Sequence, residues 1–139
     1  MRSQLSDSGG VDNSSYIRRL DSLANEDPDT PGLAEAMTTV CGLQPGALRT
    51  YIVVLDNPQS TVSDLSDRLD SSYTNVHRQL RALQELELVN RERAILPSGG
   101  HEYSWTAQPL EETRLWLQDQ FSEWREAVLD QAQELERAE

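Results

Sequence analysis

Apolar residues recur at helical spacing in two short segments between residues 61 and 86. The inward positions are Val62, Leu65 and Leu69 in the first segment and Val76, Leu80 and Leu83 in the second. Thr61 and Asp64 fit a capping box at the start of the first helix. Short side chains with oxygen atoms at 70–72 suit the turn and the N-cap that follow. The pattern predicts two helices joined by a tight turn, the second over about residues 72–86.

Two alternating segments come next and predict a β-hairpin. Residues 88–96 and 101–106 alternate as strands do, and Pro97-Ser98-Gly99-Gly100 between them supplies the turn. Helix, turn, helix and hairpin in this order predict a winged helix-turn-helix. The predicted fold class is therefore mainly α with a small β-hairpin, an α+β arrangement.

The outward face of the second helix carries the candidate chemistry. At about 100° per residue from Val76, Thr74, Arg78 and Arg81 point outward, and Asn75 and His77 flank them. No carboxylate occurs from residue 71 to residue 84, in a chain that has 24 of them. A helix that enters the major groove of DNA needs such a face, because acidic groups there would be repelled by phosphates. The alternative is that Arg78 and Arg81 only solvate a surface helix.

The first strand of the hairpin adds two basic residues. Arg91 and Arg93 lie on one face of a strand, and Glu92 projects the other way. Both arginines could contact the DNA backbone. In the second strand, Tyr103 and Trp105 are expected to pack the hairpin onto the domain rather than to stack on bases. The candidate DNA-binding residues are Ser72, Tyr73, Thr74, Asn75, His77, Arg78, Arg81, Arg91 and Arg93.

Charge is unevenly distributed along the 139 residues. All 12 basic residues are arginines, and 24 acids give a net charge of −12. This balance is typical of haloarchaeal cytoplasmic proteins, since acidic surfaces stay hydrated when salt screens their repulsion. Residues 61–106 hold five arginines and seven acids, whereas residues 107–139 hold three and nine. Most of the acidic excess therefore lies outside the predicted reading region.

The sequence offers no pattern for catalysis, for a cofactor or for a metal. Cys41 is the single cysteine, and it lies on the inward stripe of a predicted helix, as a small core residue does. His77 and His101 belong to no nucleophile or metal motif. We therefore expect a protein that is not an enzyme and does not enter a membrane, with any small-molecule effector unknown.

Four regions are expected along the chain. Residues 1–14 form a disordered leader, 15–44 hold N-terminal helices, 45–106 form the winged domain and 107–139 form a C-terminal helix. The leader is rich in Ser, Gly and Asp. The individual helices expected before the reading pair run from Ser15 to Ala24, from Pro31 to Gly42 and from Pro45 to Asp56, the last with Leu48, Ile52 and Leu55 on its buried side.

The C-terminal helix carries an apolar seam at spacings of three, four and seven residues. Its members are Leu110, Leu117, Phe121, Trp124, Val128 and Leu135. A helix of about 28 residues spans some 40 Å, which is longer than a domain of this size can cover. The seam therefore predicts a homodimer interface. The alternative is that the helix folds back wholly onto its own domain.

Several motifs together resemble a known family. They are Cys41-Gly42-Leu43-Gln44-Pro45, Leu48-Arg49-Thr50-Tyr51, Ser60-Thr61-Val62-Ser63-Asp64-Leu65, Val76-His77-Arg78-Gln79-Leu80-Arg81-Ala82-Leu83 and Leu88-Val89. Over about residues 40–106 this pattern resembles the N-terminal DNA-binding domain of archaeal TrmB-type regulators, and it is similar to small MarR-like and ArsR-like repressors. Glu87 stands where those families usually have glycine, so the helix must end without the residue that favours the left-handed conformation.

The resemblance implies a homodimer that binds double-stranded DNA at a pseudo-palindromic site. Thr74, Asn75, Arg78 and Arg81 would then enter the major groove, with Arg78 as the preferred base reader. TrmB proteins also carry a large effector domain, which this chain is too short to contain, so sugar sensing is not carried over. A second hypothesis is a winged-helix protein-interaction module that binds basic proteins and no specific DNA sequence.

Overall fold

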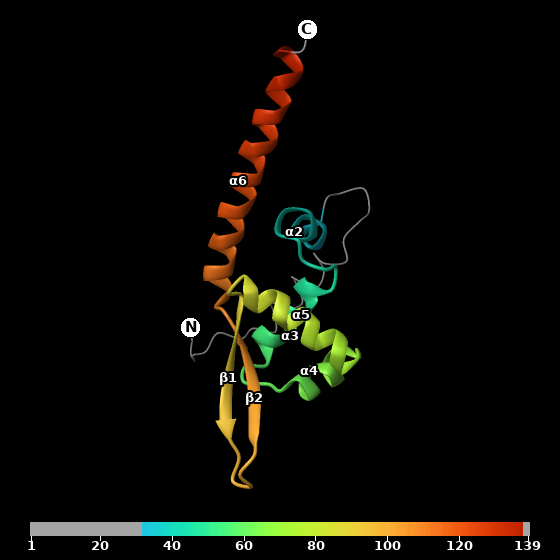
Figure 1. The fold of residues 1–139 in the computed structure, drawn as a ribbon, viewed down its shortest axis with the longest axis vertical. Helices are drawn as coiled ribbons and strands as arrows, with labels where there is room; N and C mark the ends of the chain where they lie inside the picture. The colour runs from blue at the N-terminus through green and yellow to red at the C-terminus, as the bar shows by residue number, and fades with distance from the viewer. Residues whose placement is uncertain (1–31, 138–139) are drawn as a thin grey trace, which may run out of the picture.

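The computed structural model describes residues 32–137, which form five helices and one two-stranded sheet (Figure 1). The elements are α2 (Leu33–Cys41), α3 (Ala47–Asp56), α4 (Val62–Leu69), α5 (Tyr73–Glu85), β1 (Val89–Ile95), β2 (His101–Ala107) and α6 (Leu110–Arg137). The predicted fold class, a mainly α winged helix-turn-helix with a long C-terminal helix, is confirmed. The expected leader at 1–14 and the expected helix from Ser15 to Ala24 lie outside the described residues.

The helix-turn-helix forms through the caps that the sequence predicts. Thr61 Oγ1 accepts from the Asp64 amide at 3.1 Å, and the Asp64 carboxylate accepts from the Thr61 amide at 3.3 Å. Ser72 Oγ accepts from the Asn75 amide at 3.1 Å and so caps α5. Asp70 ends α4 in the left-handed conformation, with φ 51°. These local bonds help to fix where α4 and α5 begin, because each cap satisfies an amide that the helix itself leaves unpaired.

One apolar core joins α3, α4, α5 and the hairpin. The largest fully buried side chains are Trp105, Ile52, Leu65, Leu80, Leu83, Val54, Val76 and Val89. Leu48 is buried as predicted, whereas Leu55 is only half-buried and packs at the edge of this core. Cys41 is also half-buried against it, as expected for a small packing residue.

The hairpin is tied to the domain at its base. Ser60 pairs with Trp105 as an isolated bridge, in which the Trp105 amide donates to the Ser60 carbonyl at 2.8 Å. Trp105 is fully buried, so its expected packing role is confirmed. Tyr103 is 41% exposed, and the expectation that it packs onto the domain is wrong. Its ring packs instead against Arg91 of the opposite strand, whose guanidinium carbon lies 4.0 Å from the ring centroid.

Glu87 adopts the left-handed conformation that glycine usually supplies, with φ 62°. The Leu88 amide donates to the Leu83 carbonyl and the Glu87 amide to the Gln84 carbonyl, each at 2.9 Å. This pair of bonds is a Schellman motif. The helix therefore keeps the usual termination geometry, with a side chain that is disfavoured in it.

Among residues 32–137, the contacts of the long α6 with the domain lie along its first half. The Tyr51 hydroxyl donates to the Gln108 carbonyl at 2.7 Å and shares a hydrogen bond with the Thr113 hydroxyl at 2.8 Å. Leu117 and Phe121 are half-buried against the core, and α2 contacts α6. Beyond this, α6 extends away from the domain (Figure 1).

Candidate nucleic-acid interface

The outward face of α5 is built as the sequence indicates. Thr74, Arg78 and Arg81 are exposed, whereas Asn75 and His77 are half-buried at its flanks. Within residues 32–137, neither Arg78 nor Arg81 forms an ion pair. On α6, in contrast, Arg114 pairs with Glu111 and Arg137 pairs with Glu134. Both guanidinium groups are therefore available for hydrogen bonds to a partner.

Two of the candidate residues at the start of α5 already have structural roles. The Ser72 hydroxyl accepts from the backbone as the N-cap. Asn75 Nδ2 donates to the Ser71 hydroxyl at 2.8 Å. These side chains can bond to a partner only through hydrogen-bond donors and acceptors that the protein itself does not already use. Tyr73, in contrast, is 57% exposed at the first position of α5.

Arg91 is held against two aromatic rings of the opposite strand. Its guanidinium carbon lies 4.0 Å from the centroid of the Tyr103 ring and 5.8 Å from that of Trp105. The strand register explains the contact, because Arg91 pairs with Trp105 and Arg93 pairs with Tyr103. Cation–π attraction of this kind limits the freedom of a charged side chain. The guanidinium is thus positioned between the hairpin and α5.

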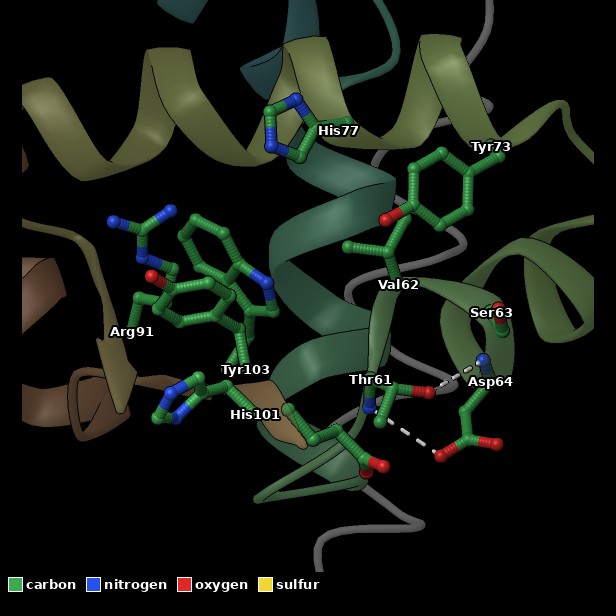
Figure 2. A pocket seen from close by; sticks show the side chains of 11 residues that line it. Thr61, Val62, Ser63, Asp64, Tyr73, His77, Arg91, His101 and Tyr103 are labelled. Atoms are coloured by element: carbon green, nitrogen blue, oxygen red, sulfur yellow. Dashed lines mark hydrogen bonds between the residues drawn. The ribbon is translucent and has the colours of Figure 1, made fainter. Parts of the chain in front are cut away.

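A cleft of about 510 Å³ lies between the start of α4, one flank of α5 and the hairpin (Figure 2). Its lining residues are Thr61, Val62, Ser63, Asp64, Tyr73, His77, Arg91, His101, Glu102, Tyr103 and Trp105. The rings of Tyr73 and His77 stack at 6.3 Å, and His77 meets the Trp105 ring edge-on at 6.4 Å. A chain of side-chain contacts therefore joins α5 to the hairpin.

The sequence did not predict this cleft. Tyr73, His77 and Arg91 were separate candidates for DNA contact, and the structure brings them together. His101 was assigned no role, although it lines the same cleft. The spacing Tyr73–His77 is one helical turn, which is the only local signal for part of the cluster.

Other chemistry is sparse in the part of the chain that the structure describes. No group of three metal-ligating side chains occurs among residues 32–137, and none of the helices there could cross a membrane. Burial raises the pKa of the Cys41 thiol, which leaves less of the reactive thiolate at neutral pH. Burial also raises the pKa of the Tyr51 hydroxyl, which stays protonated and can donate its hydrogen bond.

The structure divides the predicted seam of α6 into two parts. Leu110, Leu117 and Phe121 are half-buried and pack against the core of the same chain. The outer members Trp124, Val128 and Leu135 are 44%, 40% and 75% exposed. Leu115 and Leu129 are also exposed, at 48% each, and were not foreseen.

Comparisons with known proteins agree with this architecture. The family model described as sugar-specific transcriptional regulator TrmB matches residues 37–104. A possible transcriptional regulator from Methanosarcina mazei Go1 has a similar structure, with a TM-score of 0.67 at 19% identity over 78% of this chain and 93% of its own.

Two uncharacterized proteins of Methanocaldococcus jannaschii are similar in sequence. MJ1503 is 28% identical over 72% of this chain and 76% of its own length. MJ1082 is 26% identical over 69% of this chain and 79% of its own length. The predicted resemblance to TrmB-type regulators is confirmed by the family match, and the winged-helix fold by the structural likeness.

Proposed function

We propose that this protein, whose residues 37–104 match the TrmB family of transcriptional regulators, is a sequence-specific DNA-binding regulator that acts as a homodimer. The observation that carries this proposal is the exposed, acid-free face of α5. That face presents Thr74, Arg78 and Arg81 in a chain with a net charge of −12. A surface without carboxylates is unusual in such a chain, and a polyanionic partner gives it a reason.

In the proposed complex, α5 enters the major groove with its first turns closest to the bases. Arg78 is the best candidate for reading a base, because a guanidinium donates two hydrogen bonds to guanine in fixed geometry. Arg78 is exposed and without an ion pair among the described residues, which supports this role. Thr74 and Arg81, on the same face, would contact neighbouring bases or phosphates, and Ser72, Tyr73, Asn75 and His77 would lie beside the backbone.

The hairpin would hold the DNA backbone beside the reading helix. Arg91, packed on Tyr103, is oriented at little entropic cost when it meets a phosphate. Arg93 is exposed nearer the tip. Such contacts position a protein on DNA without reading the sequence. At high salt, counterion release adds little affinity, so direct hydrogen bonds must supply most of it.

The second copy would pair through the outer half of α6, which we define as residues 122–137. Trp124 and Val128 are large apolar residues that remain exposed there. Burying them in a two-helix seam would stabilise a dimer. A two-fold dimer could place two reading helices about one turn of DNA apart, roughly 34 Å.

A winged-helix module that binds a basic protein is the second candidate. The net charge of −12 favours it, since an acidic surface attracts cationic partners. The two functions differ in what they need from α5. A DNA reader requires the exposed arginines, whereas the acidic surface elsewhere would serve the other partner.

The test begins with duplexes selected by the full-length protein from a random pool in molar KCl. We expect Arg78→Ala to weaken binding to the selected site by about 1–3 kcal/mol, with a smaller effect on random DNA. Arg93→Ala should weaken both about equally, since it removes a backbone contact. Fluorescence anisotropy with labelled duplexes gives each affinity.

Arg125→Ala is the matched control, because Arg125 is an exposed arginine on α6 and far along the chain from the reading face. It should leave both affinities unchanged. Equal losses on selected and random DNA for Arg78→Ala would refute the base-reading role. Failure of the wild type to enrich any duplex would favour the protein-interaction module instead.

A further inference from the structure

One face of the hairpin carries two arginines and one exposed aromatic ring. The strand register pairs Tyr103 directly with Arg93, so that Arg91 lies diagonally across from it on the same face. The diagonal neighbour is the one that stacks, with its guanidinium carbon 4.0 Å from the centroid of the Tyr103 ring (Figure 2). Arg93 makes no such contact within residues 32–137. One ring therefore holds one of two neighbouring arginines.

Arg91 is held in a different way from the arginines of α6. There, Arg114 lies 2.6 Å from Glu111 and Arg137 lies 2.9 Å from Glu134, so a carboxylate balances each positive charge. In the described part of the chain, Arg91 forms no ion pair and contacts only neutral rings. Its positive charge is therefore not cancelled by the group that holds it.

The strand register keeps acidic residues off this face of the hairpin. Glu92 and Glu102 alternate with Arg91 and Tyr103 along their strands, so their side chains start from the other face. Neither carboxylate forms an ion pair with Arg91. In a chain with 24 acids, a cation is thus kept beside a ring and apart from carboxylates.

A ring and a carboxylate would serve a phosphate-binding arginine differently. Either can restrict the movement of a guanidinium, and a restricted side chain loses less entropy when it binds. A carboxylate would also repel a DNA phosphate and compete with it for the same donors. A ring attracts the cation through its face and leaves the charge and the N–H donors for a partner. A ring is therefore the better support for an arginine that contacts DNA.

The support is itself tied to α5. Tyr103 is 41% exposed, but Trp105, two residues along β2, is fully buried and forms the bridge with Ser60. The Trp105 ring lies 5.8 Å from the Arg91 guanidinium carbon and meets the His77 ring of α5 edge-on at 6.4 Å. The arginine is thus placed relative to α5 as well as to its own strand.

We propose that Tyr103 is a positioning residue, which orients Arg91 toward a phosphate of the DNA backbone without itself bonding to DNA. This inference rests on the proposed DNA-binding function. It gives a role to an exposed tyrosine that the packing of the domain does not explain, and it separates two arginines that the sequence presents as equivalent.

The first test compares two replacements of Tyr103 in the full-length protein. Binding to the duplex selected by the wild type is measured by fluorescence anisotropy in molar KCl. Tyr103→Leu should weaken binding by about threefold to tenfold, because Arg91 must then be ordered when it binds. Tyr103→Phe should keep the affinity of the wild type, since its ring also attracts a cation. Melting curves should show both variants folded, as expected for an exposed position.

A double-mutant cycle separates positioning from direct contact. In an Arg91→Ala background, Tyr103→Leu should change the affinity by less than about twofold, because the side chain that it orders is gone. Arg93→Ala is the matched background, since Arg93 lies on the same face and pairs directly with Tyr103. There, Tyr103→Leu should still cost about threefold to tenfold.

NMR tests the contact without DNA. The ring current of Tyr103 should displace the side-chain Nε–H signal of Arg91, and relaxation should show this group to be more ordered than that of Arg93. Tyr103→Leu should abolish both differences, and Tyr103→Phe should keep them. If the wild type bound no duplex but showed an ordered Arg91, the proposed function would fail and only the contact within the hairpin would stand.

Three results would overturn the positioning role. Equal losses for Tyr103→Phe and Tyr103→Leu would mean that the hydroxyl bonds to DNA. An undiminished loss for Tyr103→Leu in the Arg91→Ala background would mean that the ring contacts DNA directly. An unchanged affinity of Tyr103→Leu for a duplex that the wild type binds would mean that Arg91 needs no support.

Discussion

The outward face of α5 and the outer half of α6 are both left uncovered by the domain, but their chemistry is opposite. The α5 face exposes Thr74, Arg78 and Arg81 and has no acid until Glu85. The outer half of α6 exposes Trp124, Val128 and other apolar residues among five acids and two arginines. One surface offers hydrogen-bond donors, and the other offers apolar area surrounded by negative charge.

This difference shows which partner each surface can accept. Phosphates would be repelled by the acids of α6, and the face of α5 around Arg78 and Arg81 offers little apolar area for a second helix to bury. The two surfaces therefore cannot exchange roles. In the function proposed above, DNA and a second copy of the chain therefore bind at separate surfaces, and mutations on one helix should leave the other function intact.

Breaking the outer half of α6 should have the largest effect on DNA binding. Trp124→Glu with Val128→Glu places charges in the seam, and we expect a folded monomer. Loss of the second reading helix should weaken binding to a palindromic site by about 100-fold or more. Light scattering gives the mass, and anisotropy gives the affinity. These residues suit the test better than Phe121, which packs against the core of its own chain.

Ser122→Glu with Gln133→Glu is the control, because both positions are exposed and lie on the opposite side of the helix. This variant adds the same charge and should remain a dimer. A wild type with a monomeric mass at micromolar concentration in molar KCl would rule out the dimer.

The attachment of α6 to the domain can be weakened without touching either surface. Tyr51→Phe removes the hydroxyl that bonds to Gln108 and Thr113 in a buried place. We expect a loss of about 1–3 kcal/mol in the free energy of unfolding, since acceptors are left without a partner. Tyr73→Phe is the control, as Tyr73 is exposed, and it should change stability by less than about 0.5 kcal/mol. Equal stabilities of the two variants in urea denaturation would contradict the role given to Tyr51.

The smallest effect is expected where α5 ends. Glu87→Gly removes the backbone strain of a non-glycine residue in the left-handed conformation, at φ 62°. This change should stabilise the fold by about 1 kcal/mol, despite the greater freedom of glycine in the unfolded chain. DNA affinity should not change, because Glu87 lies outside the reading face. A drop in melting temperature would mean that the Glu87 side chain makes a favourable contact that outweighs the strain.

Local rules predicted most of the fold. The capping box of Thr61 and Asp64, the N-cap at Ser72 and the glycine turn of the hairpin depend on residues close in sequence, and all three formed as expected. The termination of α5 shows the limit of such rules. Glu87 took a conformation that its own preference opposes, because the bonds to Leu83 and Gln84 and the packing of the following strand require it.

The seam of α6 shows a different limit. Heptad spacing places Phe121 and Trp124 on the same stripe, but spacing does not reveal where the domain ends. Only the packing of α2 and the core beside the first half of α6 decides that Phe121 is covered and Trp124 is not. The same holds for Tyr103, whose alternation with Trp105 suggested equal burial.

By itself, the sequence determined the order of the elements, their caps, the inward residues and the acid-free face of α5, because these depend on periodicity and on neighbours in the chain. The tertiary structure determined the sites that segments distant in the sequence form together. The cleft joins residues from 61 to 105, and the bridge between Ser60 and Trp105 holds β2 against the domain beside it. Contacts between segments so far apart leave no periodic signal, since each depends on how all the others pack.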